Sequence, residues 1–205
     1  MHCPMIRNLL MLFIALMTFT GCKNNNIDII GKLTNPNNGE YIFLDELQAS
    51  RLITIDSAVV SGDGSFAFNL KVESPAFYLL KTDDSNFLTM LLEPGQKIEV
   101  TAHSDSLNFP VSISGSPGTE LMAEYNRELQ KTINKLSGLR EIYLKSEGTP
   151  EQPAVMEQLD SIARSYIGEM NSYTKKYIDA NLTSLVSLTA LYQQVAPGEY
   201  ILNPH

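Results

Sequence analysis

Between Ile27 and about Gly115, apolar and polar residues alternate in short runs that are separated by turn-forming residues. A period of two is typical of strands in an antiparallel sheet with one buried face. In residues 65–71, for instance, Phe66, Phe68 and Leu70 fall on the same face. The Ser-Gly-Asp-Gly turn before this strand predicts a hairpin with residues 52–60. The other strands are expected at residues 28–33, 41–46, 76–81, 87–92, 97–102 and 111–114.

After Gly115 the spacing of the apolar residues changes to three and four, which indicates amphipathic helices. Ser116 and Pro117 suit the N-cap and the first turn of the first helix. A second helix is expected after the loop at residues 146–150, with Thr149 and Gln152 as a capping box. Two apolar stripes joined by a short loop predict an antiparallel helical hairpin. Five tyrosines lie on these stripes and are expected to pack in the helical seam: Tyr125, Tyr143, Tyr166, Tyr173 and Tyr177.

A third, shorter helix is expected over residues 183–195, where leucines recur at helical spacing before a Pro-Gly pair. The sequence therefore predicts an α+β protein, mainly β and then α. An antiparallel β-sandwich or open barrel of about eight strands would occupy residues 27–115. The helical hairpin and the third helix would occupy residues 116–196, followed by a tail at residues 197–205.

The first 21 residues have the features of a signal peptide. Arg7 precedes an apolar stretch at residues 9–19, which is too short to span a bilayer as a permanent helix. Phe-Thr-Gly-Cys at residues 19–22 resembles the lipobox of bacterial lipoproteins, which implies that Cys22 is acylated and becomes the new N-terminus. The alternative is a general signal peptidase site with Cys22 incidental. Residues 22–26 then form the acylated end and a polar tether.

Charge and composition restrict the function further. The chain has 15 Lys and Arg against 23 Asp and Glu, a net charge of -8, so we expect no nucleic-acid partner. It has two Cys, three His and no Trp. Cys3 would leave with the signal peptide and Cys22 would carry lipid, so the mature chain would have no free thiol. We therefore expect no catalytic residue, metal or cofactor, and no enzymatic activity of this chain.

Several segments, taken in order, resemble the domain of unknown function 4369. They are Ile-Gly-Lys-Leu at residues 30–33, Tyr-Ile-Phe-Leu at 41–44, Ile-Asp-Ser-Ala-Val-Val at 55–60 leading to Gly-Ser-Phe at 64–66, and Leu-Glu-Pro-Gly-Gln-Lys-Ile-Glu-Val at 92–100. That domain precedes a thioredoxin-like domain in many Bacteroidetes lipoproteins. The resemblance implies a thiol-disulfide domain with a Trp-Cys-x-x-Cys site, which is absent from this sequence. The chain is therefore interpreted as a truncated or split product.

Other candidate sites are local. The Asp83-Asp84 turn could hold a hard cation, but a solvated turn is the simpler interpretation. His103 has no neighbour at metal-ligand spacing. Ser57, Ser106 and Ser161 each follow an Asp and resemble the O-glycosylation pattern of Bacteroidetes, and Ser106 is the best placed because it lies in a predicted loop. Asn181 begins an Asn-Leu-Thr sequence that we interpret as the cap of the third helix.

Two functions remain open. The first is a non-catalytic, lipid-anchored module of the cell envelope that positions or regulates a thioredoxin-like partner. The second is an envelope or surface lipoprotein that binds a glycan, a peptide or a protein through its β-domain. In either case the expected location is the outer membrane facing the periplasm. The spacer after Cys22 resembles that of Bacteroidetes lipoproteins, but it lacks the acidic residues that are associated there with export to the cell surface.

Overall fold

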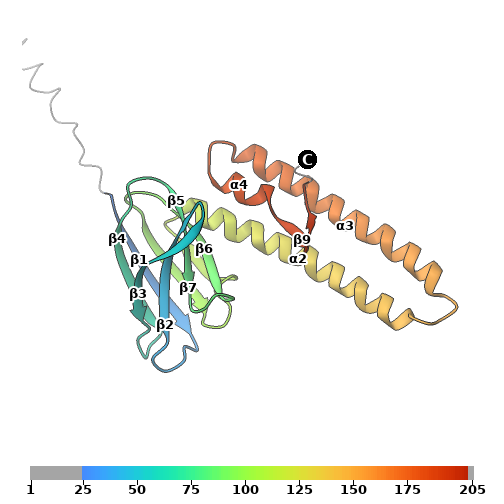
Figure 1. Ribbon diagram of the computed structural model, residues 1–205, viewed down its shortest axis with the longest axis horizontal. Helices are drawn as coiled ribbons and strands as arrows, with labels where there is room; N and C mark the ends of the chain where they lie inside the picture. The colour runs from blue at the N-terminus through green and yellow to red at the C-terminus, as the bar shows by residue number, and fades with distance from the viewer. Residues whose placement is uncertain (1–24, 203–205) are drawn as a thin grey trace, which may run out of the picture.

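The computed structural model describes residues 25–202, so the predicted signal peptide and Cys22 lie outside the described residues. Eight strands form two four-stranded sheets, and two long helices follow them (Figure 1). One sheet has the order β4-β1-β7-β8 and the other β3-β2-β5-β6. The strands are β1 (Asn26–Thr34), β2 (Tyr41–Gln48), β3 (Arg51–Val59), β4 (Ser65–Lys71), β5 (Ala76–Lys81), β6 (Phe87–Leu92), β7 (Lys97–His103) and β8 (Ser112–Ser114).

The two sheets share one core, which confirms the predicted sandwich. In the sheet β4-β1-β7-β8, strands β1, β4 and β7 contribute alternate side chains to it, as Ile27 and Ile29 of β1 and Phe66 and Phe68 of β4 illustrate. From the other sheet, alternate residues of β2, β5 and β6 point into the same cluster, among them Leu80, which is completely buried. Packing of the two inner faces removes these side chains from water and stabilises the β-domain.

Two strand pairings differ from the sequence prediction. Although the sandwich is otherwise antiparallel, β1 and β7 pair in parallel. The predicted hairpin of β3 and β4 is wrong, because β4 pairs with β1 and β3 pairs with β2. The turn itself forms as expected, with Gly64 at a φ of 86°. Its carbonyl accepts a hydrogen bond from the amide of Leu33 in β1, so the turn carries the chain from one sheet to the other.

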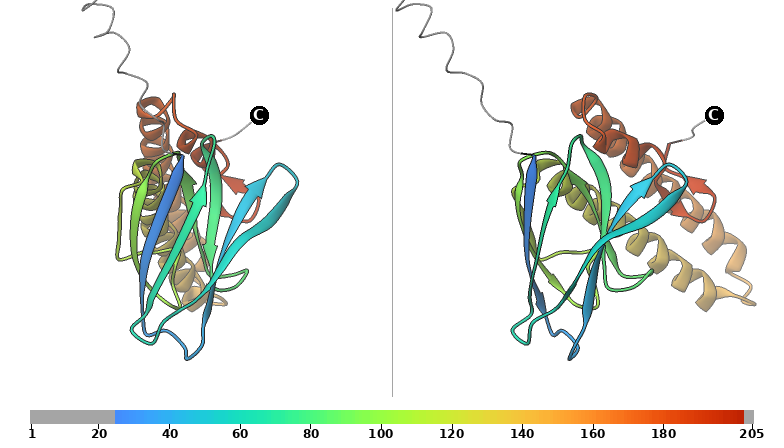
Figure 2. Two further views of the ribbon diagram at one scale, coloured as in Figure 1. Left: turned by 90° about the vertical axis from the view of Figure 1, so that its left-hand side faces the viewer. Right: turned by 60° about the vertical axis from the view of Figure 1, so that its left-hand side comes forward.

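The β2–β3 hairpin reaches beyond its neighbours. Pairing of β2 with β5 ends at Glu46 and Tyr78, whereas β2 and β3 remain paired as far as Gln48 and Arg51. A register shift at Leu44 and Asp45 bends this hairpin. In both views of Figure 2 its tip leans away from the rest of the sandwich.

The helical part consists of α2 (Pro117–Ser146), α3 (Gln152–Ala180) and the short α4 (Val186–Leu191). As predicted, α2 and α3 form an antiparallel hairpin, and Pro117 lies in the first turn of α2. None of the helices within residues 25–202 combines the length and the apolar character that crossing a bilayer requires.

The third helix is shorter than predicted. Val195, which was expected in this helix, lies instead in β9 (Gln194–Ala196), which pairs with β10 (Glu199–Tyr200). The Pro-Gly pair at residues 197–198 forms the turn between them, with Gly198 at a φ of 82°. Burial of Val195 in the helical core stabilises the extended backbone, and this tertiary contact overrides the local helical spacing.

The predicted caps are also different. The Thr149 hydroxyl donates to the Ser146 carbonyl at the end of α2, and the Gln152 side chain accepts from the amide of Gly148. The capping box at the start of α3 is therefore wrong. Asn181 likewise follows the end of α3, where its side-chain amide donates to the Tyr177 carbonyl. The Thr149 and Asn181 side chains therefore satisfy carbonyl groups at the C-terminal ends of helices rather than amide groups at N-terminal ends.

Candidate functional site

The helical hairpin divides into a covered and an uncovered half. In α2 the buried side chains end at Thr132, and in α3 they begin at Met170. We call residues 133–169 the helical arm; none of its side chains is buried. The arm projects away from the β-domain, while α4 and the β9–β10 pair lie against the covered half (Figure 1). Beyond its base, where β9–β10 lies beside it, the apolar seam of the arm therefore lacks a third covering element.

Two adjoining hollows run along one side of this hairpin, and together we call them the arm groove. The hollow at the base of the arm has a volume of about 460 Å³ and lies between the helices and β9–β10; its lining includes Ile133, Leu136, Ile167 and Val195. The outer hollow, of about 300 Å³, is lined mainly by Leu139, Tyr143, Met156 and Leu159. Arg140, Asp160 and Ala163 line both hollows, so the two adjoin at these residues.

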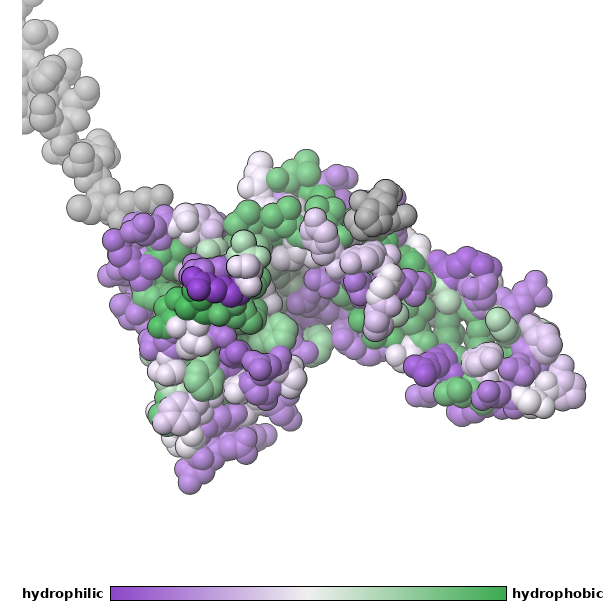
Figure 3. Space-filling view, in the orientation of Figure 1, coloured by the Kyte–Doolittle hydropathy of each residue, from purple (hydrophilic) through white to green (hydrophobic). Residues whose placement is uncertain are grey.

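The groove is mostly apolar, with charge concentrated where its two halves meet. Met156 is 58% exposed at its outer end. Asp160 forms an ion pair with Arg164 one turn further along α3. In the space-filling view, apolar and polar side chains alternate along the arm (Figure 3). Such a surface can bind apolar side chains of a partner in the hollows and orient them through the charges between.

A tyrosine cluster supports the base of the groove. The ring centroids of Tyr125 and Tyr177 are 4.9 Å apart, and those of Tyr125 and Tyr173 are 5.9 Å apart. The hydroxyl groups of Tyr125 and Thr174 are hydrogen bonded at 2.9 Å. These three tyrosines confirm the predicted packing in the helical seam, whereas Tyr143 and Tyr166 are only half-buried further out on the arm.

Burial perturbs the tyrosine hydroxyls. It raises the pKa of Tyr177, whose hydroxyl has no hydrogen-bond partner among the described residues. Burial also raises the pKa of Tyr125, against the opposing effect of its hydrogen bond with Thr174. Both hydroxyls therefore lose their protons at a higher pH than an exposed tyrosine does, which suits a packed seam better than proton transfer near neutral pH.

A buried hydroxyl pair fixes the helical unit to the β-domain. The Leu91 amide at the end of β6 donates to Thr119 Oγ1 at 3.0 Å, and the Ser116 hydroxyl donates to the Leu91 carbonyl at 2.9 Å. The two hydroxyls are 2.7 Å apart. The Leu91 side chain enters the helical core and lies so close to Gly118 that a Cβ there would be 2.7 Å from Leu91 Cδ2. This junction holds the first turn of α2 against β6.

The residues from the sandwich to this junction correspond to a known family model. Residues 27–122 match the model described as "Domain of unknown function (DUF4369)". The chain carries a DUF4369 domain. The match confirms the resemblance to that domain, while the association with thioredoxin-like lipoproteins stays a prediction. No curated protein and no solved structure matches the chain. The DUF4369 domain thus includes the sandwich and the junction, and the arm groove lies outside the matched residues.

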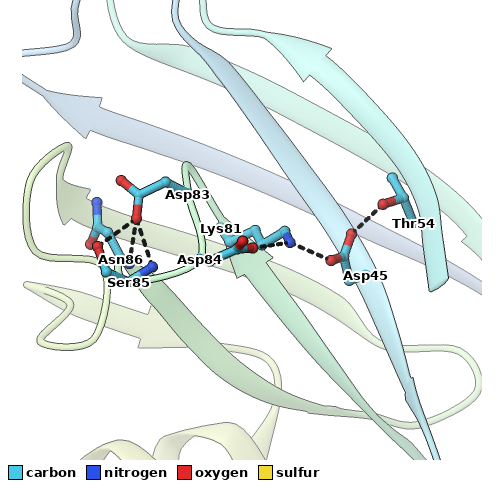
Figure 4. Close-up of polar contacts among 7 residues, drawn as sticks. All are labelled: Asp45, Thr54, Lys81, Asp83, Asp84, Ser85 and Asn86. Atoms are coloured by element: carbon cyan, nitrogen blue, oxygen red, sulfur yellow. Dashed lines mark hydrogen bonds and ion pairs between the residues drawn. The ribbon is translucent and has the colours of Figure 1, made fainter. Parts of the chain in front are cut away.

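The acidic turn of the DUF4369 domain is held by its own neighbours (Figure 4). Asp83 accepts hydrogen bonds from the backbone and hydroxyl of Ser85 and from the amide of Asn86, and the Ser85 bonds contribute most to lowering its pKa. Asp84 forms an ion pair of 2.9 Å with Lys81. Among residues 25–202 no group of three or more His, Cys, Asp or Glu is arranged to hold a metal.

Lys81 also reaches a buried carboxylate that the sequence did not reveal. Its Nζ is 2.8 Å from Asp45, which is 2% exposed and accepts a second bond from the Thr54 hydroxyl. Hydrogen bonds to Asp45 and Asp84 raise the pKa of Lys81. Asp45 lies at the register shift of β2, and the only sequence signal is a charged residue inside an apolar strand. Its partners explain its burial, and the group is structural.

The other predicted sites are dispersed. His103 is exposed at the end of β7 and is hydrogen bonded to Thr34. Ser57 is exposed on β3, Ser106 is half-buried in the β7–β8 connection, and Ser161 is exposed on α3. The structure brings none of these three serines together, and each stays a prediction as a glycosylation site. The apolar stripes predicted the helical hairpin but not the arm groove, because the base of the groove is closed by the unexpected β9–β10 pair.

Proposed function

We propose that this protein is a non-catalytic, lipid-anchored module of the cell envelope that holds a thioredoxin-like partner on its helical arm. Cys22 would carry the acyl chains, and the protein would face the periplasm from the outer membrane. Its work in this account is to position or regulate the partner.

The observation that carries this proposal is the uncovered arm groove. A two-helix hairpin leaves half of each apolar stripe facing solvent unless another element covers it. In this chain α4 and β9–β10 cover only the base, and Met156 and the half-buried Leu139 and Leu159 remain accessible in the outer hollow. Because a protein partner would bury these side chains, the groove is suited to protein contact.

The choice of partner comes from the sequence resemblance. A DUF4369 domain is present at residues 27–122, and the lipoproteins that the sequence resembles carry a thioredoxin-like domain after the corresponding helical region. In the proposal, a separate or once-fused thioredoxin-like protein occupies the arm. The rigid junction at Leu91 and Thr119 would then hold that partner at a fixed orientation to the β-domain.

Direct binding tests this proposal. The acylated protein, in detergent micelles, is titrated with purified thioredoxin-like envelope proteins of the same cell. We expect saturable binding that Met156→Asp weakens by at least about tenfold, because the change puts a charge into an apolar contact. The matched control is Leu144→Asp, since Leu144 is 53% exposed on the same arm but does not line the groove.

Two results would reject the proposal. One is the absence of binding to every thioredoxin-like protein tested, or binding that both variants weaken equally. The other is reduction of insulin disulfides by the purified protein alone, which would show that it is catalytic.

The anchor is tested separately: Cys22→Ser should move the protein into the soluble periplasmic fraction and abolish lipid labelling.

A second candidate function is supported by the outer face of the sheet β4-β1-β7-β8. A shallow hollow of about 480 Å³ there is lined by Asp28, Asn69, Lys97 and Glu99 around Ile30, which is 59% exposed. Carboxylate, amide and ammonium groups around an apolar side chain suit a glycan or a peptide. A glycan array probed with the protein distinguishes the two candidates, since the arm proposal predicts no glycan ligand.

A further inference from the structure

The tether between the proposed acyl anchor and the first strand is short. Only residues 23–25 separate Cys22 from Asn26, where β1 begins. Four residue steps span at most about 14 Å, even when fully extended. If Cys22 is acylated, as the proposed function requires, the start of β1 must therefore lie close to the lipid headgroups.

Other parts of the molecule lie at the same end. We define the anchor end as the start of β1 together with the β2–β3 and α3–α4 connections, which lie at the upper end of the molecule in Figures 1 and 2. Strand directions agree with this. Because β1 pairs antiparallel with β4, the β4–β5 connection is also at this end, and β5 in turn pairs antiparallel with β2. The β1–β2, β3–β4, β5–β6 and β7–β8 connections lie at the opposite end.

The anchor end exposes large apolar side chains. Leu47 and Leu52 face each other across the tip of the β2–β3 hairpin and are 47% and 45% exposed. In the α3–α4 connection Leu182 is 70% exposed. Figure 3 shows apolar side chains gathered over both connections. Leucines on two separate projections cannot cover each other, so a surface that reaches both must bury them.

The charges differ between the two ends. Arg51, Lys71 and Lys97 lie at strand ends on the anchor side, where Glu73, which is ion-paired with Lys71, and Glu93 lie in the β4–β5 and β6–β7 connections. The connections at the opposite end contain five carboxylates and no Lys or Arg: Glu40, Asp63, Asp83, Asp84 and Asp105. The anchor end is therefore the less acidic of the two, so an anionic lipid surface disfavours the opposite end more strongly.

We propose that the anchor end is a membrane-contact surface and that its occupant is the phospholipid bilayer itself. Leu47, Leu52 and Leu182 enter the headgroup region, and Arg51 lies beside the lipid phosphates. This contact adds to the acyl chains and fixes the orientation of the protein. Because the arm extends from the opposite side of the helical unit to the α3–α4 connection, the same contact directs the arm groove away from the membrane.

Depth-dependent fluorescence quenching tests this surface. Under the proposed function the mature chain has no free thiol, so a single introduced cysteine can be labelled selectively with nitrobenzoxadiazole. The variants are Leu52→Cys and Leu182→Cys, with Val111→Cys as the matched control, since Val111 is an apolar residue 59% exposed beside β8 at the opposite end. Each acylated protein is reconstituted into vesicles of phosphatidylethanolamine and phosphatidylglycerol that contain headgroup-nitroxide lipid.

We expect nitroxide lipid to quench the probes at positions 52 and 182 at least about twofold and to leave the probe at position 111 unchanged. If the protein floats with the vesicles but position 111 is quenched as strongly as the other two, or none is quenched, the membrane-contact surface is wrong and the anchor stands. If the protein does not float with the vesicles, or Cys22 itself takes the label, the proposed acylation is wrong and this inference fails with it.

Discussion

The β-domain and the helical arm bury their apolar residues to very different extents. In the sandwich, alternate residues from both sheets are removed almost completely from water, as Leu80 and Met90 are at 0% exposure. Between residues 133 and 169 of the arm no side chain reaches that state. The sandwich can therefore stabilise itself, whereas the arm keeps apolar surface that a partner can bury. The difference suggests that the stability of this protein resides mainly in one region and its binding capacity in the other.

The largest loss of stability should come from the sandwich core. Leu80→Ala removes a completely buried side chain between the two sheets. We expect the free energy of unfolding to fall by about 2–5 kcal/mol, because the lost transfer energy adds to the cost of a cavity. Urea unfolding followed by circular dichroism measures the change. Leu144→Ala on the arm is the control and should stay within about 0.5 kcal/mol of wild type; equal losses would refute the comparison.

The junction should give the next largest effect. Thr119→Val removes the oxygen that accepts the Leu91 amide and bonds the Ser116 hydroxyl. A buried donor then loses its partner, so the free energy of unfolding should fall by about 1–3 kcal/mol. The same urea experiment measures it, with Thr183→Val in the exposed α3–α4 connection as the control. If the junction does not contribute to stability, Thr119→Val and Thr183→Val will have the same free energy of unfolding.

The tyrosine cluster should make stability sensitive to alkaline pH. Burial raises the pKa of Tyr177 above that of the unfolded chain, so the unfolded state loses its proton first. The contribution of this pKa difference to the free energy of unfolding is complete below pH about 10, and it is lost as the pH rises through the pKa of Tyr177 in the folded protein. Tyr177→Phe should therefore raise the midpoint of alkaline unfolding. It should also increase stability at neutral pH by up to about 1 kcal/mol, because the hydroxyl it removes is buried without a partner.

Alkaline titration followed by circular dichroism measures that midpoint. Tyr192→Phe is the control, since Tyr192 is 67% exposed. An unchanged midpoint in Tyr177→Phe would mean that the hydroxyl reaches solvent or a partner. Burial also raises the pKa of Tyr78 in the sandwich, so some alkaline sensitivity should remain in both variants.

The smallest effect should come from the groove itself. Met156→Ala changes a side chain at the exposed end of α3 and should alter the free energy of unfolding by less than about 0.5 kcal/mol. Met170→Ala changes the same residue type on the same helix where it is 3% exposed, and should cost about 2–5 kcal/mol. A large loss from Met156→Ala would show that the arm is part of the folding core.

Much of the fold could be predicted because the hydrophobic period is a local signal. The strands at residues 76–81 and 87–92 form over the predicted ranges, and the two helical stripes meet as a hairpin. The pairing of β4 with β1 could not be predicted from its turn, because the turn chemistry of Gly64 is the same whether the chain stays in one sheet or changes sheet.

The candidate site was predictable only in part. Tyr143 was expected on an apolar stripe of the hairpin, and it lines the arm groove. The point at which the two stripes lose their cover depends on α4 and on the β9–β10 pair. Gln194 and Val195 continue the local helical spacing but lie in a strand, because Val195 is buried in the helical core. Such a short segment is decided by tertiary contact and not by its own propensity.

Hydrogen exchange of the protein, measured with and without a purified thioredoxin-like envelope protein that carries a Trp-Cys-x-x-Cys site, tests the central claim most directly. The account predicts slower amide exchange across residues 133–163 when the partner is bound, and unchanged exchange in the strands of the DUF4369 domain. Protection confined to β1, β4 and β7, or no protection in the arm by any such partner, would contradict it.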